Sequence, residues 1–444
     1  MQKELFSLHF KLHFDFYILI FDFFLQEAIQ RNMHDFNYIG SDLYCEKAPI
    51  KKIAQEVGTP VYIYSSNTLR NHYKAFDSAF ADIPHIVCFA VKANSNLSIL
   101  RLFASEGGGA DIVSGGELFR ALRAGIDPQK IVFAGIGKTE EEIVFALKSN
   151  ILMFNVESSL ELQKINEVAG GLGLKARVAL RVNPDIDPKT HPYIATGLKK
   201  SKFGIAISLA LEEYQLASTL PNIEVAGVHK HIGSQITDVG PFVAAMEKIL
   251  ELFKRLKKSG IEIKYINAGG GLGIRYGEEK PPHPKELGKA LVPMIKDLGC
   301  TLIFEPGRVL VGNAGILVTK VLYLKSGEVK NFVIVDAGMN DLIRPSLYDA
   351  HHEIIPVEKQ DGSYLTADVV GPICESGDFL AKDRKIEKPE PGNLLAVMSA
   401  GAYGFTMSSN YNSRRRGAEV MVEGDRYTVI RKRESYEDLI RGEL

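Results

Sequence analysis

The sequence predicts a (β/α)₈ TIM-type barrel followed by a second, all-β domain of the sandwich or barrel kind. Three observations predict it. Short apolar runs alternate with amphipathic segments over about 230 residues, as in a barrel. The carboxyl ends of these runs carry polar residues and glycines, and beyond residue 313 the pattern changes to strands with turns and few helices. An open doubly wound sheet is the alternative arrangement for the first part.

The first 32 residues differ in composition from the rest. They are rich in Phe, Leu and Ile, yet their longest unbroken apolar run covers residues 16–21, and Lys11, Asp15 and Asp22 interrupt the pattern. A membrane span needs about 20 apolar residues, and no small-residue cleavage site indicates a secretory signal. We therefore expect residues 1–32 to form an N-terminal extension outside the fold, with a membrane-surface helix as the alternative.

The composition is that of an ordinary globular protein. Hydrophobic residues make up 45% of the 444 residues, charged residues 24%, and the formal net charge is -1. Such a balance gives no indication of binding to nucleic acid or to an anionic membrane. The four cysteines, Cys45, Cys88, Cys300 and Cys374, have no metal or redox spacing, so we expect reduced thiols in a cytoplasmic protein.

The elements follow in order from Met33. Residues 33–66 contain leading strands, of which 60–65 is expected to join the β domain, and a helix is expected over 69–80. The barrel occupies 67–312 and the β domain 313–444. The barrel strands are predicted at 86–91, 110–114, 131–135, 151–156, 176–182, 224–232, 265–271 and 301–307. One connecting helix carries Leu118, Ala121 and Leu122 on one face and stops at Gly125.

Polar residues and glycines follow many of these strands, and the carboxyl-end face of a barrel carries the active site. They are Lys92, Ser114, Asn183, His231 with Ser234, Gly269 to Gly271, and Glu305 with Arg308. Lys92 ends an apolar strand buried on both faces, so we expect poor solvation and a lowered pKa. A part-neutral lysine is a nucleophile for aldehydes. The sequence predicts a Schiff-base site there, unless Lys92 caps the strand and faces water.

The last two barrel strands end in groups that suit a phosphate. Gly269, Gly270 and Gly271 let backbone N–H groups approach an anion, although a tight turn explains them equally well. Arg308 offers a forked cation for phosphate or carboxylate, and Glu305 offers a carboxylate for a protonated ring nitrogen. A salt bridge at the barrel rim is the alternative for this second pair.

Two histidines, His229 and His231, lie two positions apart and share a face of their strand. Such a pair binds metal in amidohydrolase-like barrels. There, however, the pair lies on the first strand, and no matching later His and Asp ligands are found in this sequence. Otherwise one imidazole can stack flat on an aromatic cofactor.

The motifs FAVKAN, HIGSQ, GGGLG, EPGR, RPSLY, GPICESGD and GAYG occur in this order. In this series the chain, from about residue 33 to 444, resembles diaminopimelate decarboxylase, of the barrel-type, alanine-racemase-like group of pyridoxal-phosphate enzymes. Lys230 between the two histidines and Ala268 before the glycines are minor departures. The resemblance implies decarboxylation of meso-2,6-diaminopimelate to L-lysine and CO₂, the last step of lysine biosynthesis.

The resemblance also implies roles for the cofactor site. Lys92 would form the Schiff base with pyridoxal 5'-phosphate, His231 would stack on its pyridine ring, and Glu305 would keep the ring nitrogen protonated, which makes the ring an electron sink. The phosphate would be held by Ser234, Gly269, Gly270, Gly271 and the stretch Glu305, Pro306, Gly307 and Arg308.

For the substrate, the resemblance implies that Arg308, Arg344 and Tyr348 bind carboxylate, Glu375 binds the distal amino group, and Tyr403 touches cofactor and substrate. Cys374 would donate a proton from the partner subunit of a homodimer with shared active sites. From the residues alone, Arg344 and Glu375 suit the distal end of diaminopimelate but also suit a surface, and Cys374 also suits a buried structural thiol.

Other functions remain open. A decarboxylase of ornithine, arginine or carboxynorspermidine would give Arg344 little to do, because those substrates lack a distal carboxylate. An amino-acid racemase needs a second catalytic base, for which no motif is found. A non-catalytic pyridoxal-phosphate carrier resembles a lone barrel without a β domain. The metal-dependent hydrolase rests on His229 and His231 alone.

Overall fold

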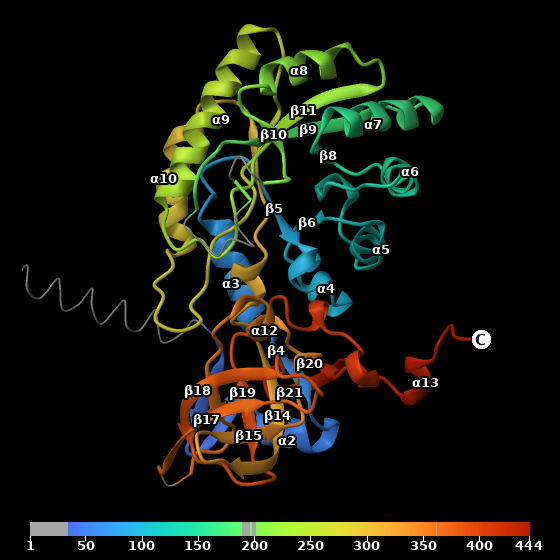
Figure 1. Cartoon of the computed structure of the whole chain (residues 1–444). Helices are drawn as coiled ribbons and strands as arrows, with labels where there is room; N and C mark the ends of the chain where they lie inside the picture. The colour runs from blue at the N-terminus through green and yellow to red at the C-terminus, as the bar shows by residue number, and fades with distance from the viewer. Residues whose placement is uncertain (1–33, 189–195, 198–200, 361) are drawn as a thin grey trace, which may run out of the picture.

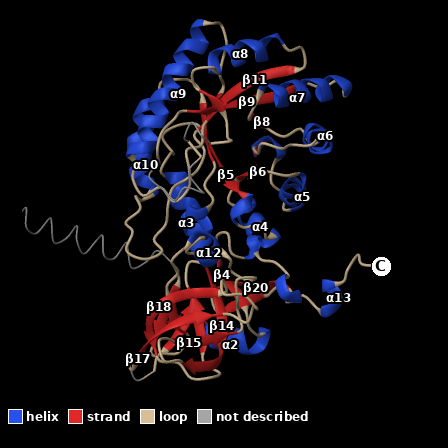
Figure 2. Ribbon diagram, in the orientation of Figure 1, coloured by secondary structure: helices blue, strands red, loops and turns tan. Residues whose placement is uncertain are grey.

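The computed structural model describes residues 34–188, 196–197, 201–360 and 362–444. The prediction for residues 1–32 lies outside this part of the chain. The described chain forms two domains that lie one above the other in Figure 1. The upper one is a barrel with helices on its outside, and the lower one is mostly strand (Figure 2).

Eight parallel strands close the barrel, since each pairs with the next and the last, β13, pairs with the first, β5. The predicted barrel is therefore confirmed and the open sheet is excluded. The strands are β5 (His85–Ala90), β6 (Gly109–Ile112), β7 (Ile131–Phe133), β8 (Met153–Val156), β9 (Ala176–Asn183), β11 (Ile223–His229), β12 (Tyr265–Asn267) and β13 (Thr301–Phe304). The two-residue strand β10 (Ile205–Ala206) pairs with β9 outside the ring.

Helices connect these strands and cover the barrel. They are α3 (Ser66–Ser78), α4 (Leu97–Ser105), α5 (Gly115–Arg123), α6 (Glu140–Lys148), α7 (Ser159–Gly171), α8 (Ala210–Thr219), α9 (Gly240–Lys258), α10 (Pro284–Ile295) and the short α11 (Arg308–Val311). Helix α5 buries Leu118 and Ala121 as predicted. The chain turns after it at Gly125, whose φ of 87° favours glycine.

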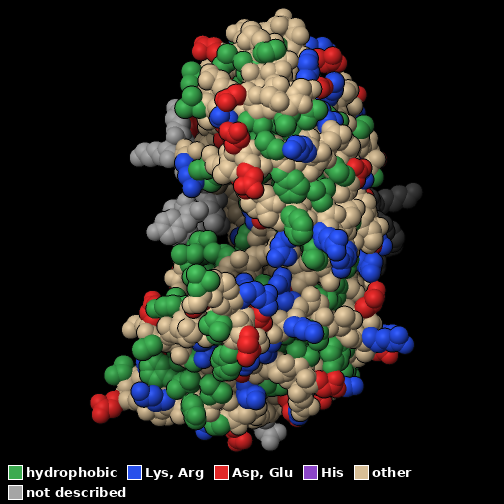
Figure 3. Space-filling view, turned by 90° about the vertical axis from the view of Figure 1, so that its right-hand side faces the viewer, with side chains coloured by type: hydrophobic (Ala, Val, Ile, Leu, Met, Phe, Trp, Pro, Cys, Tyr) green, Lys and Arg blue, Asp and Glu red, His purple; other side chains and the backbone are tan. Residues whose placement is uncertain are grey.

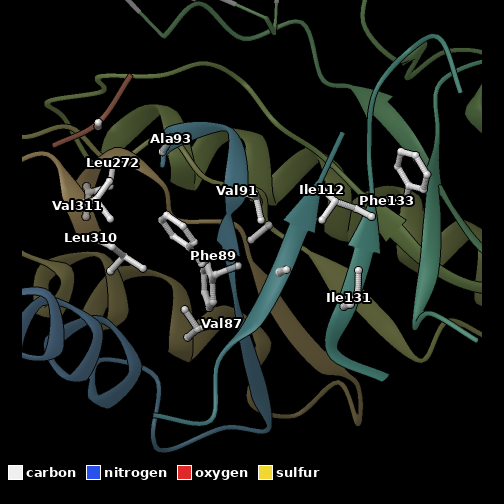
Figure 4. Close-up of a cluster of buried hydrophobic side chains, with 14 of the residues drawn as sticks. Val87, Phe89, Val91, Ala93, Ile112, Ile131, Phe133, Leu272, Leu310 and Val311 are labelled. Carbon is white, nitrogen blue, oxygen red and sulfur yellow. The ribbon is translucent and has the colours of Figure 1, made fainter. Parts of the chain in front are cut away.

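Alternating side chains of the barrel strands face the helices and the barrel axis. On β5, Val87 and Phe89 point outward into the main core, which continues along the neighbouring strands with Ile112 of β6 and Phe133 of β7 (Figure 4). The inward residues form a small separate apolar cluster. Its buried members are Cys88, Val132, Leu152, Met153, Ala179, Ala226 and Ile303. This apolar cluster closes the lower part of the barrel interior.

The β domain consists of β14 to β21 together with elements from the start of the chain. Strand β4 (Val61–Ser65) pairs antiparallel with β14 and parallel with β20, and it lies in the sheet order β18-β17-β15-β14-β4-β20-β21. The later strands are β14 (Gly315–Ser326), β15 (Asn331–Val335), β16 (Ile354–Pro356), β17 (Tyr364–Val370), β18 (Phe379–Glu387), β19 (Leu394–Val397), β20 (Ala418–Glu423) and β21 (Arg426–Arg431).

Smaller elements complete the β domain. A small sheet at the start of the described chain, formed by β1 (Phe36–Ile39), β2 (Asp42–Cys45) and β3 (Ala48–Pro49), packs together with α2 (Ile50–Val57) against the same core as β4, β14 and β20. Two short helices lie later in the chain, α12 (Arg344–Tyr348) and α13 (Tyr436–Leu439). Among the described helices, none is both long enough and apolar enough to cross a membrane.

Candidate active site

A layer of polar side chains sits above the apolar cluster inside the barrel. On four strands the polar residue comes two positions after an inward apolar or aromatic one, as Asn155 does after Met153. Because strands of a parallel barrel end at one face, these side chains meet there. The buried members are Asp111, Asn155, Arg181, His229, Asn267 and Glu305.

A cavity of about 690 Å³ opens above this layer, between the barrel and the β domain. Its volume suits a cofactor with a small substrate. Ten of the predicted site residues line it: Lys92, His231, Ser234, Gly271, Glu305, Gly307, Arg308, Arg344, Tyr348 and Tyr403. Residues that follow different barrel strands are thus brought together with side chains from the β domain.

Glu305 is the anionic group at the bottom of the cavity. Its Oε1 accepts hydrogen bonds from Asn155 (2.9 Å) and Asn267 (2.6 Å), and its Oε2 lies 3.3 Å from Nε2 of His229. Burial alone raises the pKa of Glu305, but His229 and Lys92 outweigh it and hold the pKa below its ordinary value. A buried carboxylate held ionised in this way can stabilise a proton on a ring nitrogen.

Lys92 lies in a short 3₁₀ turn (Val91–Ala93) after β5, and its Nζ is 3.1 Å from Oδ2 of Asp111. Burial lowers the pKa of Lys92, but the charges of Asp111 and Glu305 outweigh it and raise this pKa above its ordinary value. The sequence-based prediction of a lowered pKa is therefore wrong, because a buried carboxylate faces the ammonium. Burial and Glu305 in turn raise the pKa of Asp111 to about 7.

His231 is held by the glycine loop, residues 269–271 after β12. Its Nδ1 accepts a hydrogen bond from the N–H of Gly270 at 3.2 Å. Burial, Arg181 and Lys92 lower the pKa of His231 well below its ordinary value. The ring is therefore neutral and carries its proton on Nε2. His229 is directed at Glu305, so the two histidines bind protein groups. In the part of the chain that the structure describes, no cluster of three or more His, Cys, Asp or Glu side chains could hold a metal ion.

The three glycines after β12 pack tightly against neighbouring backbone. A Cβ on Gly270 would lie 2.0 Å from the carbonyl oxygen of Glu305, and one on Gly271 would lie 2.4 Å from that of Gly233. The N–H groups of Gly269 and Gly270 donate to Asn267 and His231. Of the three, Gly271 lines the cavity. Glycine is thus required at these positions because neighbouring backbone approaches so closely.

Arg308 connects Ser234 with Tyr276 across the cavity wall. It donates through Nη2 to the hydroxyl of Ser234 at 3.1 Å and through Nη1 to the hydroxyl of Tyr276 at 2.5 Å. Its guanidinium also lies 4.9 Å from the ring centre of Tyr403, whose N–H donates to the carbonyl of Ala93. Together, Ser234, Gly271 and Arg308 present the hydroxyl, backbone and cation that a phosphate group requires.

Arg344 begins α12 of the β domain and is buried, with 5% of its surface exposed. Its guanidinium lies 4.6 Å from the centre of the Tyr276 ring, and the guanidinium of Arg308 lies 5.7 Å from the same ring centre. Tyr348 lies one turn further along the same helix and also lines the cavity. Two cations therefore face one cavity from two domains.

Cys374 and Glu375 are not among the residues that line the cavity. Both are exposed on a loop between β17 and β18. The N–H of Cys374 donates to Asn412 at 2.9 Å, and Glu375 accepts a hydrogen bond from Tyr411. The alternative of a buried structural thiol is wrong for Cys374, whereas Cys45, Cys88 and Cys300 are buried and free.

Three further predicted site residues do not line the main cavity either. Gly269, Gly270 and Pro306 line a separate small cavity instead.

Two other polar residues at strand ends have structural partners. Ser114 caps α5, because its Oγ accepts from the N–H of Glu117. Asn183 donates to the carbonyl of Phe203.

Some residues of the polar layer were missed by the sequence analysis. Asp111, Asn155 and Asn267 were not predicted as site residues. Their signal was present, since each is a polar residue inside an apolar strand, and buried polar groups require partners. Tyr276 lies in an irregular loop that gave no such signal.

Comparison with known proteins agrees with this geometry. Residues 66–312 match the pyridoxal-binding domain of the pyridoxal-dependent decarboxylases. Diaminopimelate decarboxylase of Aquifex aeolicus is 54% identical, over 92% of this chain and 97% of that protein. The same enzyme of Vibrio cholerae is 53% identical, over 92% and 98%.

Solved structures give the same result. The crystal structure of diaminopimelate decarboxylase from Helicobacter pylori complexed with L-lysine matches with a TM-score of 0.85 and 45% identity, over 88% of this chain and 98% of that one. The resemblance found in the sequence motifs is confirmed. The chain belongs to the diaminopimelate decarboxylase family of pyridoxal-dependent decarboxylases.

Proposed function

We propose that this protein decarboxylates meso-diaminopimelate to L-lysine and CO₂ with pyridoxal phosphate as its cofactor. One observation carries the proposal. A lysine, an ionised buried carboxylate and two arginines meet in a single cavity between the two domains. Membership of the family supports the same reaction. We place the reaction in the cytoplasm, which the isolated, unpaired cysteines support.

The residues present fit pyridoxal phosphate. Gly271 brings backbone to the cavity surface, and Ser234 and Arg308, which are hydrogen-bonded to each other, line the same cavity. When bound, the cofactor supplies an electron sink for the carbanion left by decarboxylation. In the proposed arrangement, Lys92 would hold the aldehyde end of the cofactor, Glu305 would keep its ring nitrogen protonated, and the neutral imidazole of His231 would contact its ring.

The proposed substrate has two carboxylates, and Arg344 is a cavity arginine that the phosphate does not require. One carboxylate leaves as CO₂, while the distal amino acid end stays and requires a cationic partner. We assign that role to Arg344, with Arg308 and Tyr348 beside it, because Arg344 lies on the β-domain side of the cavity, away from the barrel strands. Burial of Arg344 strengthens its attraction for a carboxylate. Glu375 is assigned to the distal amino group.

The exposed position of Cys374 and Glu375 leads us to propose a homodimer with shared sites. In this arrangement the loop between β17 and β18 of one subunit reaches the cavity of its partner, where the Cys374 thiol protonates the carbanion. Figure 3 shows one face of the molecule, on which Lys and Arg side chains gather near the middle, with hydrophobic and acidic side chains around them.

A substrate panel tests the proposed function. Purified protein reconstituted with pyridoxal phosphate is incubated in turn with meso-diaminopimelate, ornithine, arginine and lysine, and the released CO₂ is measured. We expect release from diaminopimelate to exceed that from the others by about tenfold or more, because a charge-assisted contact to the distal carboxylate is absent in the others. Faster release from ornithine or arginine would replace the proposed substrate with one of those.

Replacing Asp111 with asparagine is expected to ease cofactor attachment at neutral pH. Asp111 is the largest influence that raises the pKa of Lys92, so its removal leaves burial opposed only by Tyr403 and Glu305, and this pKa should fall. Since the neutral amine is the nucleophile, attachment should be faster in the variant than in the wild-type protein at each pH between 6 and 10. Stopped-flow absorbance after mixing cofactor-free protein with pyridoxal phosphate measures this rate. An equal or slower rate in the variant contradicts the role given to Asp111.

Replacing Arg344 with leucine is expected to weaken recognition of the distal carboxylate. A charge-assisted hydrogen bond contributes about 1.5–3 kcal/mol, so kcat/KM for diaminopimelate should fall by about tenfold or more, chiefly through KM. Steady-state kinetics measures this. Arg177→Leu is a matched control, because Arg177 contacts Gln129 and Asn150 at the opposite end of β9. Unchanged kinetics of Arg344→Leu would contradict the assignment.

A further inference from the structure

His352 of the β domain binds the same guanidinium that is assigned to the substrate. Nη1 of Arg344 lies 2.7 Å from Nε2 of His352. On its other side the imidazole is 2.8 Å, through Nδ1, from the carbonyl oxygen of Met398. The ring is fully buried, and it meets the ring of Tyr276 edge-on at 5.3 Å. His352 therefore contacts both Arg344 and the Tyr276 ring on which Arg344 stacks, although it is not among the residues that line the cavity.

These two contacts determine the protonation of His352. A carbonyl oxygen can only accept, so Nδ1 carries a proton and donates it to Met398. Arg344 can only donate, so Nε2 must offer its lone pair. Only the neutral ring protonated on Nδ1 satisfies both neighbours. A doubly protonated ring would set a hydrogen against the guanidinium.

The surroundings favour that neutral state. Burial and the charge of Arg344 lower the pKa of His352, and the bond to Met398 opposes them only in part, which leaves a pKa of about 3. His351 and Arg308 also lower the pKa of His352. The contact between His352 and Arg344 is thus intact throughout the neutral pH range.

Without His352, little in the described structure would fix the guanidinium in rotation. Nε of Arg344 is buried and has no hydrogen-bond partner among the described residues, and the face of the guanidinium rests on Tyr276 at 4.6 Å. A stacking contact leaves a planar group free to turn in its own plane, whereas a hydrogen bond from Nη1 selects one direction. The histidine therefore determines which edge of Arg344 faces the cavity.

We infer that His352 is a positioning residue for substrate selection, which as a neutral acceptor orients Arg344 toward the distal carboxylate of the substrate. This inference rests on the proposed function of Arg344. Preorganised ionic contacts bind more tightly because less side-chain freedom is lost on binding. His352 thereby acts on diaminopimelate through Arg344 and does not touch the reacting atoms.

Two substitutions separate orientation of Arg344 from mere packing. His352→Gln carries an amide oxygen at the reach of Nε2 and keeps the acceptor, whereas His352→Asn keeps a donor near Met398 and loses that acceptor. We expect His352→Asn to raise KM for meso-diaminopimelate roughly fivefold to tenfold with little change in kcat, and His352→Gln to restore most of it. His85→Gln is the control, because His85 contacts Asp77 and Ile83 at the opposite end of β5.

The thermal unfolding midpoints of the variants decide between the two roles. If His352→Asn and His352→Gln lose stability and affinity to the same extent, His352 merely packs, and the inference is overturned. Unchanged KM in His352→Asn would overturn it as well.

A second readout does not depend on catalysis. In ¹⁵N-histidine-labelled protein, NMR should show His352 as the neutral form protonated on Nδ1 at pH 6.5, and Arg344→Leu should change its Nε2 shift. A cationic His352, or one protonated on Nε2, would overturn the inference. If the wild-type protein released no CO₂ from diaminopimelate, the proposed function would fail, while this readout would still decide whether His352 accepts from Arg344.

Discussion

Replacing Lys92 with alanine is expected to eliminate covalent attachment of pyridoxal phosphate and to lower turnover by about 10²–10⁴-fold or more. Lys92 is the lysine at the end of β5 whose side chain lines the cavity, beside Glu305 and His231. Loss of the amine removes both the covalent anchor and a proton carrier. The glycine loop, Ser234 and Arg308 would still bind the phosphate, so noncovalent binding should persist.

Borohydride reduction followed by peptide mass spectrometry measures the attachment. In the wild-type protein, the reduced cofactor should be found on Lys92. The matched control is Lys230→Met. Lys230 is also buried, but its Nζ lies 5.4 Å from the ring centre of Phe242, in a separate small cavity behind the glycine loop. Attachment at Lys230, or attachment that survives in Lys92→Ala, would refute the assignment.

Replacing Cys374 with alanine is expected to slow turnover by about 10²–10⁴-fold while cofactor binding is retained. After CO₂ leaves, a positioned acid must protonate the carbanion, and in the proposal that acid is the thiol. Because Cys374 is exposed and absent from the cavity of its own chain, the proposal requires the thiol to come from a second subunit. Absorption spectra and steady-state kinetics of the variant separate binding from turnover.

Mixing two inactive variants tests the shared site. In a mixed dimer of Lys92→Ala and Cys374→Ala, one site combines an intact barrel with an intact thiol, while the other carries both defects. Random exchange yields half mixed dimers, so roughly a quarter of the wild-type activity should return.

The control for this experiment is a mixture of Lys92→Ala with the double variant Lys92→Ala and Cys374→Ala, which contains no intact site. Exchange of subunits is verified by co-purification through a tag on one variant. If exchange occurs and no activity returns, Cys374 acts within its own chain or takes no part in the reaction.

The fold class could be predicted because the barrel leaves a strong pattern. Apolar strands recur between amphipathic helices, and the change beyond residue 313 indicates the β domain. The predicted strand 265–271 is longer than β12, which ends at Asn267. Glycines 269–271 leave the ladder there and turn toward the cavity, which apolar periodicity does not indicate. Apolar periodicity likewise does not indicate that β13 ends at Phe304, immediately before Glu305.

The cavity could be predicted only in part. Lys92, His231, Ser234, Glu305 and Arg308 follow strands, and the barrel brings strand ends together. The charge of Lys92 could not be predicted, because it depends on Asp111, a partner from the neighbouring strand β6.

Residues from loops were harder to find. Tyr276 and His352 lie in irregular segments, where no periodicity indicates which way a side chain points. The contact of Tyr276 with Arg344 also depends on how the β domain packs on the barrel. The exposure of Cys374 likewise follows from the folding of the loop between β17 and β18, and residue type alone favours burial.

Product analysis tests the central claim most directly. Purified protein with added pyridoxal phosphate is given meso-diaminopimelate, and NMR follows both the amino acid and the CO₂. Our account predicts L-lysine and CO₂ in equal amounts, with no reaction when the cofactor is withheld. Conversion of meso-diaminopimelate to its stereoisomers without CO₂ would identify a racemase, and no reaction at all would contradict the proposed function.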